Sequence, residues 1–221
     1  MTELSIAQEY LLCSLNEKGK LPVMSTEVPA CILAGGLIEL MVSGCIRTGE
    51  KNKVQIADGT AESPVYLASL KDFINQLQQV KLEKIAREYC FSFTGKRMNT
   101  LVTDIGNSLA GAGCVTVQAG GFLAGKPSFV PNPEAVDKVI QKIRAEMLES
   151  GAMTDETVAL VGLLEKSSRI KRYFSSYEAG QLKERLKEIR ETSSNRMIKQ
   201  MVDYIDSMIA VIAVITSTSA H

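Results

Sequence analysis

Tryptophan is absent from this sequence of 221 residues, and histidine occurs once, as His221 at the final position. Histidine is the side chain most often used as a general base and as a metal ligand. No C-x-x-C pair of the kind that holds zinc occurs among the five cysteines, which are Cys13, Cys31, Cys45, Cys90 and Cys114. We therefore expect no metal site, no cofactor and no enzymatic activity, and we interpret the cysteines as reduced core residues.

A surplus of charge of either sign is also lacking. The 25 Lys and Arg residues are balanced by 25 Asp and Glu residues, so the net charge is zero. Nucleic-acid-binding domains usually carry a positive field, so we expect no nucleic-acid partner. Apolar residues make up 45% and charged residues 23%, which is typical of a soluble globular protein with a real core.

Long apolar runs are missing as well. The run from Met208 to Ile215 is far shorter than the ~20 residues that a membrane-spanning helix needs. The stretch from Ala30 to Val42 is longer but contains Glu39, which favours a buried core helix. The first eight residues include a glutamate and lack the apolar region of a secretory signal. We expect a cytoplasmic protein whose membrane contact, where it has one, is peripheral.

Hydrophobic periodicity predicts a mainly α fold, namely a single helical domain over residues 1–221 with a central helix-bundle core and two short β-hairpins. The first hairpin is predicted from residues 45–48 and 54–57, and the second from residues 114–117 and 122–130 around a glycine-rich tip. The predicted helices cover residues 4–16, 29–43, 63–77, 82–89, 98–109, 132–147, 154–164, 178–191 and 196–215.

The glycine-rich tip resembles a phosphate-binding loop, but the resemblance fails at one position. Gly120 to Lys126 matches G-x-x-x-x-G-K, but Pro127 stands at the next position, where the Ser or Thr hydroxyl that ligates magnesium is needed. Proline also lacks the N–H that a phosphate would accept from. We interpret the segment from Gly120 to Phe129 as a hairpin that is available for pairing with another chain.

Glu39 is the carboxylate that stands out, because it lies in an otherwise apolar helix. A buried charge must be paired or hydrogen-bonded. A structural ion pair or a contact with a helix end is favoured over catalysis.

Two basic regions are candidates for binding anions. Lys and Arg outnumber Glu between Lys166 and Lys199, and Arg169, Lys171 and Arg172 lack neighbouring carboxylates there. Elsewhere, three aromatic residues lead directly into Lys96 and Arg97. Aromatic side chains beside cations are typical of a lipid interface, although core packing explains Tyr89, Phe91 and Phe93 equally well.

Several segments together resemble the Golgi phosphoprotein 3 family. They are LSIAQEYLL (4–12), LNEKGK (15–20), AGGLIEL (34–40) with GCI (44–46), LAGAG (109–113) and TDETVALVGLL (154–164). The resemblance covers nearly the whole chain and implies a largely helical domain with a four-helix core and a protruding hairpin. The eukaryotic adaptors of this family bind phosphatidylinositol 4-phosphate and the cytosolic tails of glycosyltransferases, so the resemblance implies these two kinds of partner.

The lipid pocket that the resemblance implies is not matched in residue type. Met24 stands at the position of the family's tryptophan, Leu33 at its first arginine, and Asn99 and Val102 at two further arginines. Phosphoinositide headgroups are usually held by arginine forks, so we expect poor binding of this lipid and identify the chain as similar to bacterial members. The remaining candidates for headgroup contact are Lys20, Lys96 and Arg97.

The sequence thus predicts a non-enzymatic adaptor that binds anionic membranes peripherally or binds protein tails. The alternative is a soluble oligomeric scaffold that self-associates through the hairpin from Gly120 to Phe129 and has no lipid role.

Overall fold

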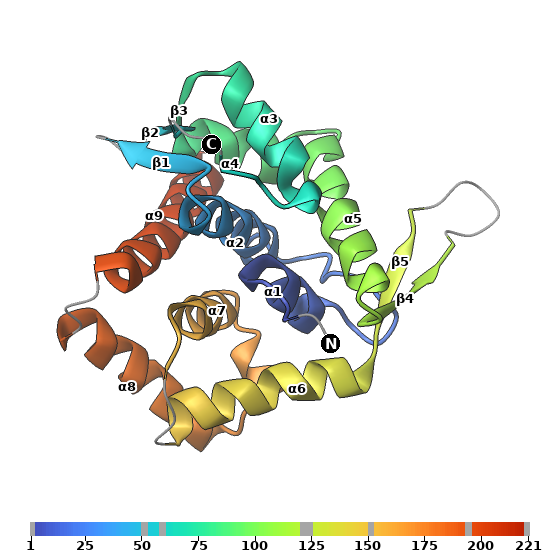
Figure 1. Cartoon of the computed structure of the whole chain (residues 1–221), viewed down its shortest axis with the longest axis vertical. Coiled ribbons are helices and arrows are strands. Elements are labelled where there is room, and N and C mark those ends of the chain that lie inside the picture. The colour runs from blue at the N-terminus through green and yellow to red at the C-terminus, as the bar shows by residue number, and fades with distance from the viewer. Residues whose placement is uncertain are drawn as a thin grey trace.

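The computed structural model in Figure 1 describes residues 3–49, 53–57, 61–119, 126–149, 153–192 and 196–218. Helices dominate these residues, and the strands form two small antiparallel sheets, which confirms the mainly α prediction. The helices are α1 (Ile6–Ser14), α2 (Glu27–Val42), α3 (Ala68–Gln76), α4 (Leu82–Cys90), α5 (Lys96–Gly111), α6 (Pro133–Ile143), α7 (Asp155–Lys166), α8 (Ser176–Thr192) and α9 (Arg196–Thr218). The strands are β1 (Ile46–Gly49), β2 (Lys53–Ile56), β3 (Gln79–Lys81), β4 (Val115–Gln118) and β5 (Ser128–Pro131).

Helix α2 forms the centre of the core, as its apolar composition predicts. Helices α1, α4, α7 and α9 pack against it, and its residues from Ala30 to Leu40 are buried (Figure 1). The helix begins at Glu27 rather than at the predicted Pro29. Backbone N–H groups in the first turn of a helix have no acceptor within the helix, so proline is tolerated anywhere in that turn. The position of Pro29 therefore does not identify the first residue of α2.

Local capping explains where three helices begin. Ser5 and Gln8 form the predicted capping box at α1, in which each side chain accepts the backbone N–H of the other residue. Asn132 caps α6 by accepting the N–H of Glu134 at 3.0 Å, and Thr154 caps α7 in the same manner.

The first sheet has one strand more than the sequence predicts. The predicted hairpin is present as β1 and β2, and β3 pairs antiparallel with β2 so that Val54 lies opposite Val80. Strand β3 has three residues, with Gln79 and Lys81 on either side of Val80. A segment this short has too few residues for an alternating pattern to be recognised.

The second hairpin, β4 with β5, projects from the body beside the end of α5 (Figure 1). Its predicted tip, Gly120 to Gly125, lies outside the described residues. Pro127 is followed by strand β5 and not by a helix, so the phosphate-loop interpretation is excluded as predicted. Phe129 anchors the hairpin, because its ring is buried and its backbone N–H donates to the carbonyl of Gly19 at 3.2 Å.

Helix α9 is longer than predicted, which corrects the argument about membrane spans. The apolar run from Met208 to Ile215 lies within a continuous helix, and its stretch Lys199–Thr218 is long and apolar enough to cross a membrane by length and composition alone. One face of this helix, with Met201, Ile205 and Met208, is buried in the protein core. The same length and composition are typical of core helices.

Candidate functional site

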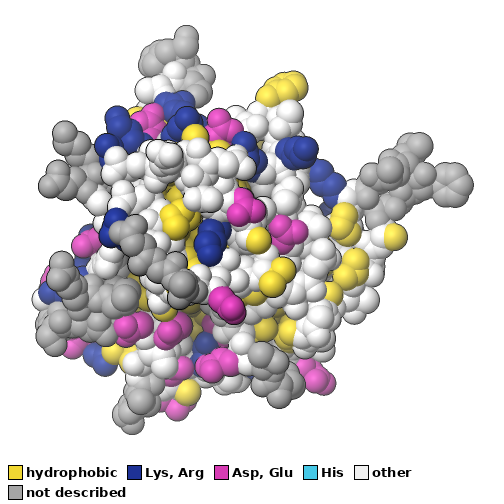
Figure 2. Space-filling model, turned by 45° about the horizontal axis from the view of Figure 1, so that its top comes forward, with side chains coloured by type: hydrophobic (Ala, Val, Ile, Leu, Met, Phe, Trp, Pro, Cys, Tyr) yellow, Lys and Arg dark blue, Asp and Glu magenta, His cyan; other side chains and the backbone are white. Residues whose placement is uncertain are grey.

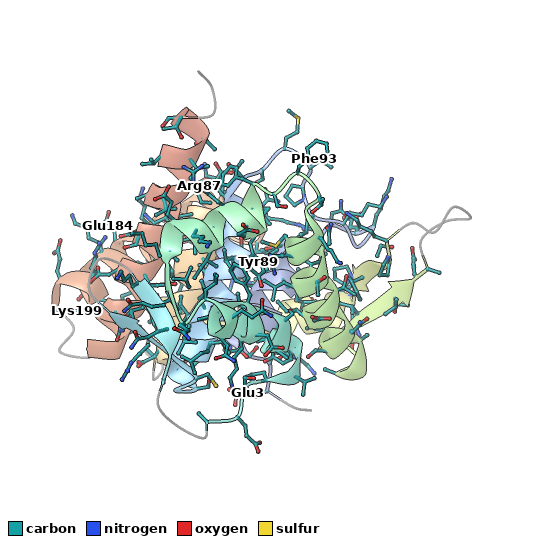
Figure 3. All side chains as sticks on the ribbon, turned by 90° about the horizontal axis from the view of Figure 1, so that it is seen from above. Glu3, Arg87, Tyr89, Phe93, Glu184 and Lys199 are labelled. Carbon is teal, nitrogen blue, oxygen red and sulfur yellow. The ribbon has the colours of Figure 1, made fainter. Side chains whose placement is uncertain are left out.

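The turn between α4 and α5 separates the three aromatic residues that the sequence placed together. Tyr89 is buried, with its ring edge-on to that of Phe73 at 5.6 Å between centroids, and Phe91 is half-buried. Phe93 is fully exposed and points away from the body (Figure 3). Core packing therefore accounts for two of the rings, and Phe93 remains as a candidate for contact with a partner or a lipid.

Backbone geometry holds Phe93 at this position. The N–H of Gly95 donates to the carbonyl of Ser92 at 3.0 Å, which closes a tight turn around Phe93 and Thr94. Gly95 has a positive φ of 58°, a conformation that glycine adopts without steric cost, and α5 begins directly after it. The exposed ring therefore belongs to an ordered turn.

The two predicted cations at the start of α5 have different surroundings. Arg97 donates to Glu88 at 3.4 Å and lies over the ring of Phe73, 4.3 Å from its centroid. Lys96 is exposed, and among the described residues we find no ion pair for it. Lys96 is thus available to an anion, whereas Arg97 mainly holds α5 against α3 and α4.

A shallow polar groove adjoins this turn. Two neighbouring hollows of about 360 and 370 Å³ share Thr94, Lys96 and Thr100. The remaining residues that line them are Ser69, Glu88, Tyr89, Ser92, Arg97, Asn99, Thr103 and Asp104. Hydroxyl and amide groups predominate, and the two carboxylates balance the two cations. Figure 2 shows Lys and Arg side chains along the upper margin of this face, with a hydrophobic side chain protruding at the top.

The four residues that the sequence resemblance aligned with a lipid pocket lie in different environments. Leu33 is fully buried in α2, and Val102 is half-buried against the core. Asn99 lines the polar groove, and Met24 is fully exposed in the segment before α2. Lys20 is exposed, with its backbone N–H donating to the side chain of Asn16 at 3.0 Å.

Two of the three predicted cations near the end of α7 form hydrogen bonds with backbone carbonyl groups. Arg172 donates to the carbonyl of Leu15, just after the end of α1, and its guanidinium lies 5.4 Å from the centroid of the Tyr173 ring. Arg169 donates to the carbonyl of Ser167 at 3.4 Å. Lys171 is exposed, and we find no ion pair for it in the described part of the chain.

Glu39 makes the helix-end contact that the sequence favoured over catalysis. Its carboxylate accepts the backbone N–H of Ala7, in the first turn of α1, at 3.2 Å. It also accepts the hydroxyl of Tyr66, whose pKa is raised by burial and by this hydrogen bond. A helix N-terminus with its partial positive charge suits a carboxylate, so Glu39 is stabilised without a cationic partner.

The structure buries four of the five cysteines, as the interpretation of these residues as core residues predicts. All five cysteines are free thiols, and Cys90 alone among them is partly exposed. Burial raises the pKa of Cys13 and of Cys31 to about 12, so neither thiol ionises at neutral pH. Among the residues that the structure describes, no group of His, Cys, Asp or Glu is arranged to hold a metal ion.

The sequence analysis did not predict which apolar side chains are exposed, although it named Phe93 as a candidate for a lipid interface. Val23 and Met24, before α2, are almost completely exposed, as is Phe93. A weak signal was present, because each lies beside residues that interrupt the helical periodicity: Pro22 and Ser25 around the first pair, and Ser92 and Thr94 around Phe93.

Comparison with known proteins identifies a family. The sequence model of the family described as Golgi phosphoprotein 3 (GPP34) matches residues 6–206. Among curated proteins, no individual sequence matches the chain. The family match extends from α1 into α9 and so includes the α4–α5 turn and both hairpins. The chain belongs to the Golgi phosphoprotein 3 family.

Proposed function

We propose that this protein is a non-enzymatic adaptor that binds the cytoplasmic face of an anionic membrane peripherally, through the turn between α4 and α5. The observation that carries the proposal is the fully exposed ring of Phe93 beside Lys96, which is exposed and has no ion pair with any residue that the structure describes. In this arrangement Phe93 enters the interfacial region of the bilayer while Lys96 contacts lipid phosphates.

The energies fit reversible binding. Burial of a fully exposed Phe side chain contributes about 1.5–3 kcal/mol, and a lysine near an anionic surface contributes about 1 kcal/mol. Together these terms do not anchor a protein permanently. Membrane association is then sensitive to salt and to lipid charge, because the lysine contribution is screened within a Debye length of about 10 Å at 0.1 M salt.

The groove beside the turn favours general anionic lipid over a phosphoinositide. Its two cations are balanced by Glu88 and Asp104, and Arg97 is already paired with Glu88. A headgroup with several phosphates needs more uncompensated positive charge than this groove provides. The proposal therefore includes no preference for phosphatidylinositol 4-phosphate over other lipids of equal charge.

The experiment is co-sedimentation of the full chain with vesicles of phosphatidylcholine and phosphatidylglycerol at low salt. Phe93→Ser is expected to weaken binding about tenfold or more, since 1.4 kcal/mol corresponds to a factor of ten. The matched control is Tyr177→Ser, because Tyr177 is 75% exposed at the start of α8, at the opposite end of the molecule from the α4–α5 turn (Figure 1).

Three outcomes contradict the proposal. One is the absence of binding at low salt, and another is an equal loss of binding in both variants. The third is selective binding of vesicles that contain phosphatidylinositol 4-phosphate, beside vesicles of equal charge without it.

A second function, self-association through the β4–β5 hairpin, is favoured by one observation. Val117 is 46% exposed on β4, and among the described residues no strand pairs with the outer edge of β4. Light scattering tests this alternative. If the chain is an oligomeric scaffold, its mass exceeds that of one chain and Val117→Lys reduces it.

A further inference from the structure

The basic region after Lys166, which the membrane proposal does not use, borders a groove between α7, α8 and α9. Two hollows of about 230 and 480 Å³ share Glu165 and Lys183 and so adjoin each other; together they are called the groove. Helix α8 lies on the outer side of α7 and away from α1 and α2 (Figure 1). The groove is therefore at the periphery of the core and distant from the α4–α5 turn.

The groove has a mainly apolar lining in its smaller hollow and a mixed polar and apolar lining in its larger one. The apolar and glycine residues that line it are Gly162, Leu186, Val202 and Ile205 in the smaller hollow and Ile170, Phe174, Ala179 and Gly180 in the larger one. Leu186 and Val202 are half-buried and expose apolar surface to the groove. Gly162 lets α7 and α9 approach closely here, because a Cβ atom there would lie 3.3 Å from Cδ1 of Ile205.

The charges at the rim divide into a neutralised end and a positive end. In the smaller hollow, Asp206 pairs with both Lys166, at 2.9 Å, and Arg190, at 2.6 Å. The smaller hollow also carries Glu184, whereas the larger one has Lys171 and Lys183 against the single carboxylate of Glu165. Lys183 is 70% exposed, and its ion pair with Glu165 is long, at 4.0 Å.

Two further lysines add to the positive charge of the rim. Lys171 lines the larger hollow and Lys187 the smaller one, and for neither do we find an ion pair in the described ranges. Lys171 and Lys183 thus both line the larger hollow, next to the mainly apolar smaller one.

We propose that this groove binds a single-chain anionic amphiphile, with its alkyl chain against the apolar lining of the smaller hollow and its carboxylate or phosphate headgroup between Lys171 and Lys183. An alkyl chain gains from covering Leu186 and Val202, which water now contacts. An anionic headgroup in the larger hollow is close to two lysines and remains partly hydrated, which avoids the cost of burying a charge.

The first test is a fluorescence titration of the full chain with 11-(dansylamino)undecanoic acid, followed by competition below the micelle concentration of each competitor. Laurate and dodecyl phosphate are expected to displace the probe, and the stronger of the two identifies the headgroup chemistry. Dodecyltrimethylammonium has an equally long chain and the opposite charge, and it is expected not to compete. The proposal is overturned if the probe does not bind, or if the cationic amphiphile competes as well as laurate.

The second test uses variants of the groove. The double variant Lys171→Gln, Lys183→Gln is expected to weaken laurate binding about fivefold. Val202→Trp fills the apolar end and is expected to abolish binding, while circular dichroism and retained vesicle binding show that the variant is folded. Lys96→Gln, at the membrane site, is the matched control and is expected to bind laurate normally. An equal effect of Lys96→Gln, or none from the groove variants, contradicts the proposal.

Discussion

Gly106 and Phe129 provide a sharp test of how the β4–β5 hairpin is held on the helical body. A Cβ atom added at Gly106, within α5, would lie 2.6 Å from three atoms of the Phe129 ring. Overpacking of this kind costs about 1–3 kcal/mol. Replacing a glycine inside a helix with alanine gains about 1 kcal/mol. Gly106→Ala is therefore expected to destabilise the protein by about 0–2 kcal/mol.

The sign of this effect is expected to reverse when the ring is removed. Phe129 is 2% exposed, so Phe129→Ala alone is expected to cost about 3–5 kcal/mol. In that background Gly106→Ala has no ring to meet, and it is expected to stabilise the protein by about 1 kcal/mol. The coupling energy between the two positions is then about 1–3 kcal/mol.

Urea denaturation of the four proteins, followed by circular dichroism at 222 nm, measures this cycle. Gly180→Ala is the control, because a Cβ atom at Gly180 in α8 has open space around it and no link to Phe129. It is expected to stabilise both backgrounds equally. If Gly106→Ala changes the free energy of unfolding by the same amount with and without the Phe129 ring, the packing of the hairpin against α5 is wrong.

Three further predictions concern titration, thiol reactivity and a backbone constraint. Hydrogen bonds from Arg144 and from the N–H of Ser175 lower the pKa of Glu178 from 4.5 to about 2. The contribution of Glu178 to stability is therefore complete above about pH 4.5 and is lost as the pH falls through 2. Glu178→Gln is expected to lower the denaturant midpoint of unfolding at pH 7 but not at pH 2. Burial raises the pKa of Cys13 to about 12, so this thiol is expected to react with a disulfide reagent at pH 8 only after the protein unfolds. Mass spectrometry follows the labelling, and rapid labelling of Cys13 in the native protein would contradict its burial. Gly19→Ala is expected to destabilise the protein by about 1–3 kcal/mol in urea denaturation. The reason is that φ of Gly19 is 69° and that a Cβ atom there would lie 2.5 Å from the backbone of Phe129. An unchanged free energy of unfolding would refute this close approach.

The helices were predictable because their apolar residues repeat at helical spacing and their ends carry capping residues. Ser5 with Gln8 marked the start of α1, and Asn132 with Pro133 marked the start of α6. Strand β3 was missed because it depends on pairing with β2 and has hardly any pattern of its own. The full length of α9 was missed because small and polar residues follow its last apolar turn.

The site was predictable only as a region. The sequence placed aromatic residues beside Lys96 and Arg97, but the distinction between the buried Tyr89 and the exposed Phe93 depends on the turn that Gly95 closes. Likewise, the pairing of Arg97 with the ring of Phe73 joins residues from different helices, which no local pattern reveals. The role of Glu39, in contrast, was predictable from the sequence. A lone carboxylate in a buried helix requires a compensating hydrogen bond or charge, whichever part of the chain supplies it.

The central claim, that the α4–α5 turn contacts the membrane, is tested most directly by tryptophan fluorescence. The natural chain contains no tryptophan, so Phe93→Trp places a single reporter at the exposed position of the turn. Vesicles of phosphatidylglycerol and phosphatidylcholine are expected to shift its emission to shorter wavelength, and brominated lipid chains are expected to quench it. Tyr177→Trp on α8 is expected to show neither effect. If the protein binds the vesicles while the emission of Phe93→Trp stays unchanged, another surface contacts the membrane and the account is contradicted.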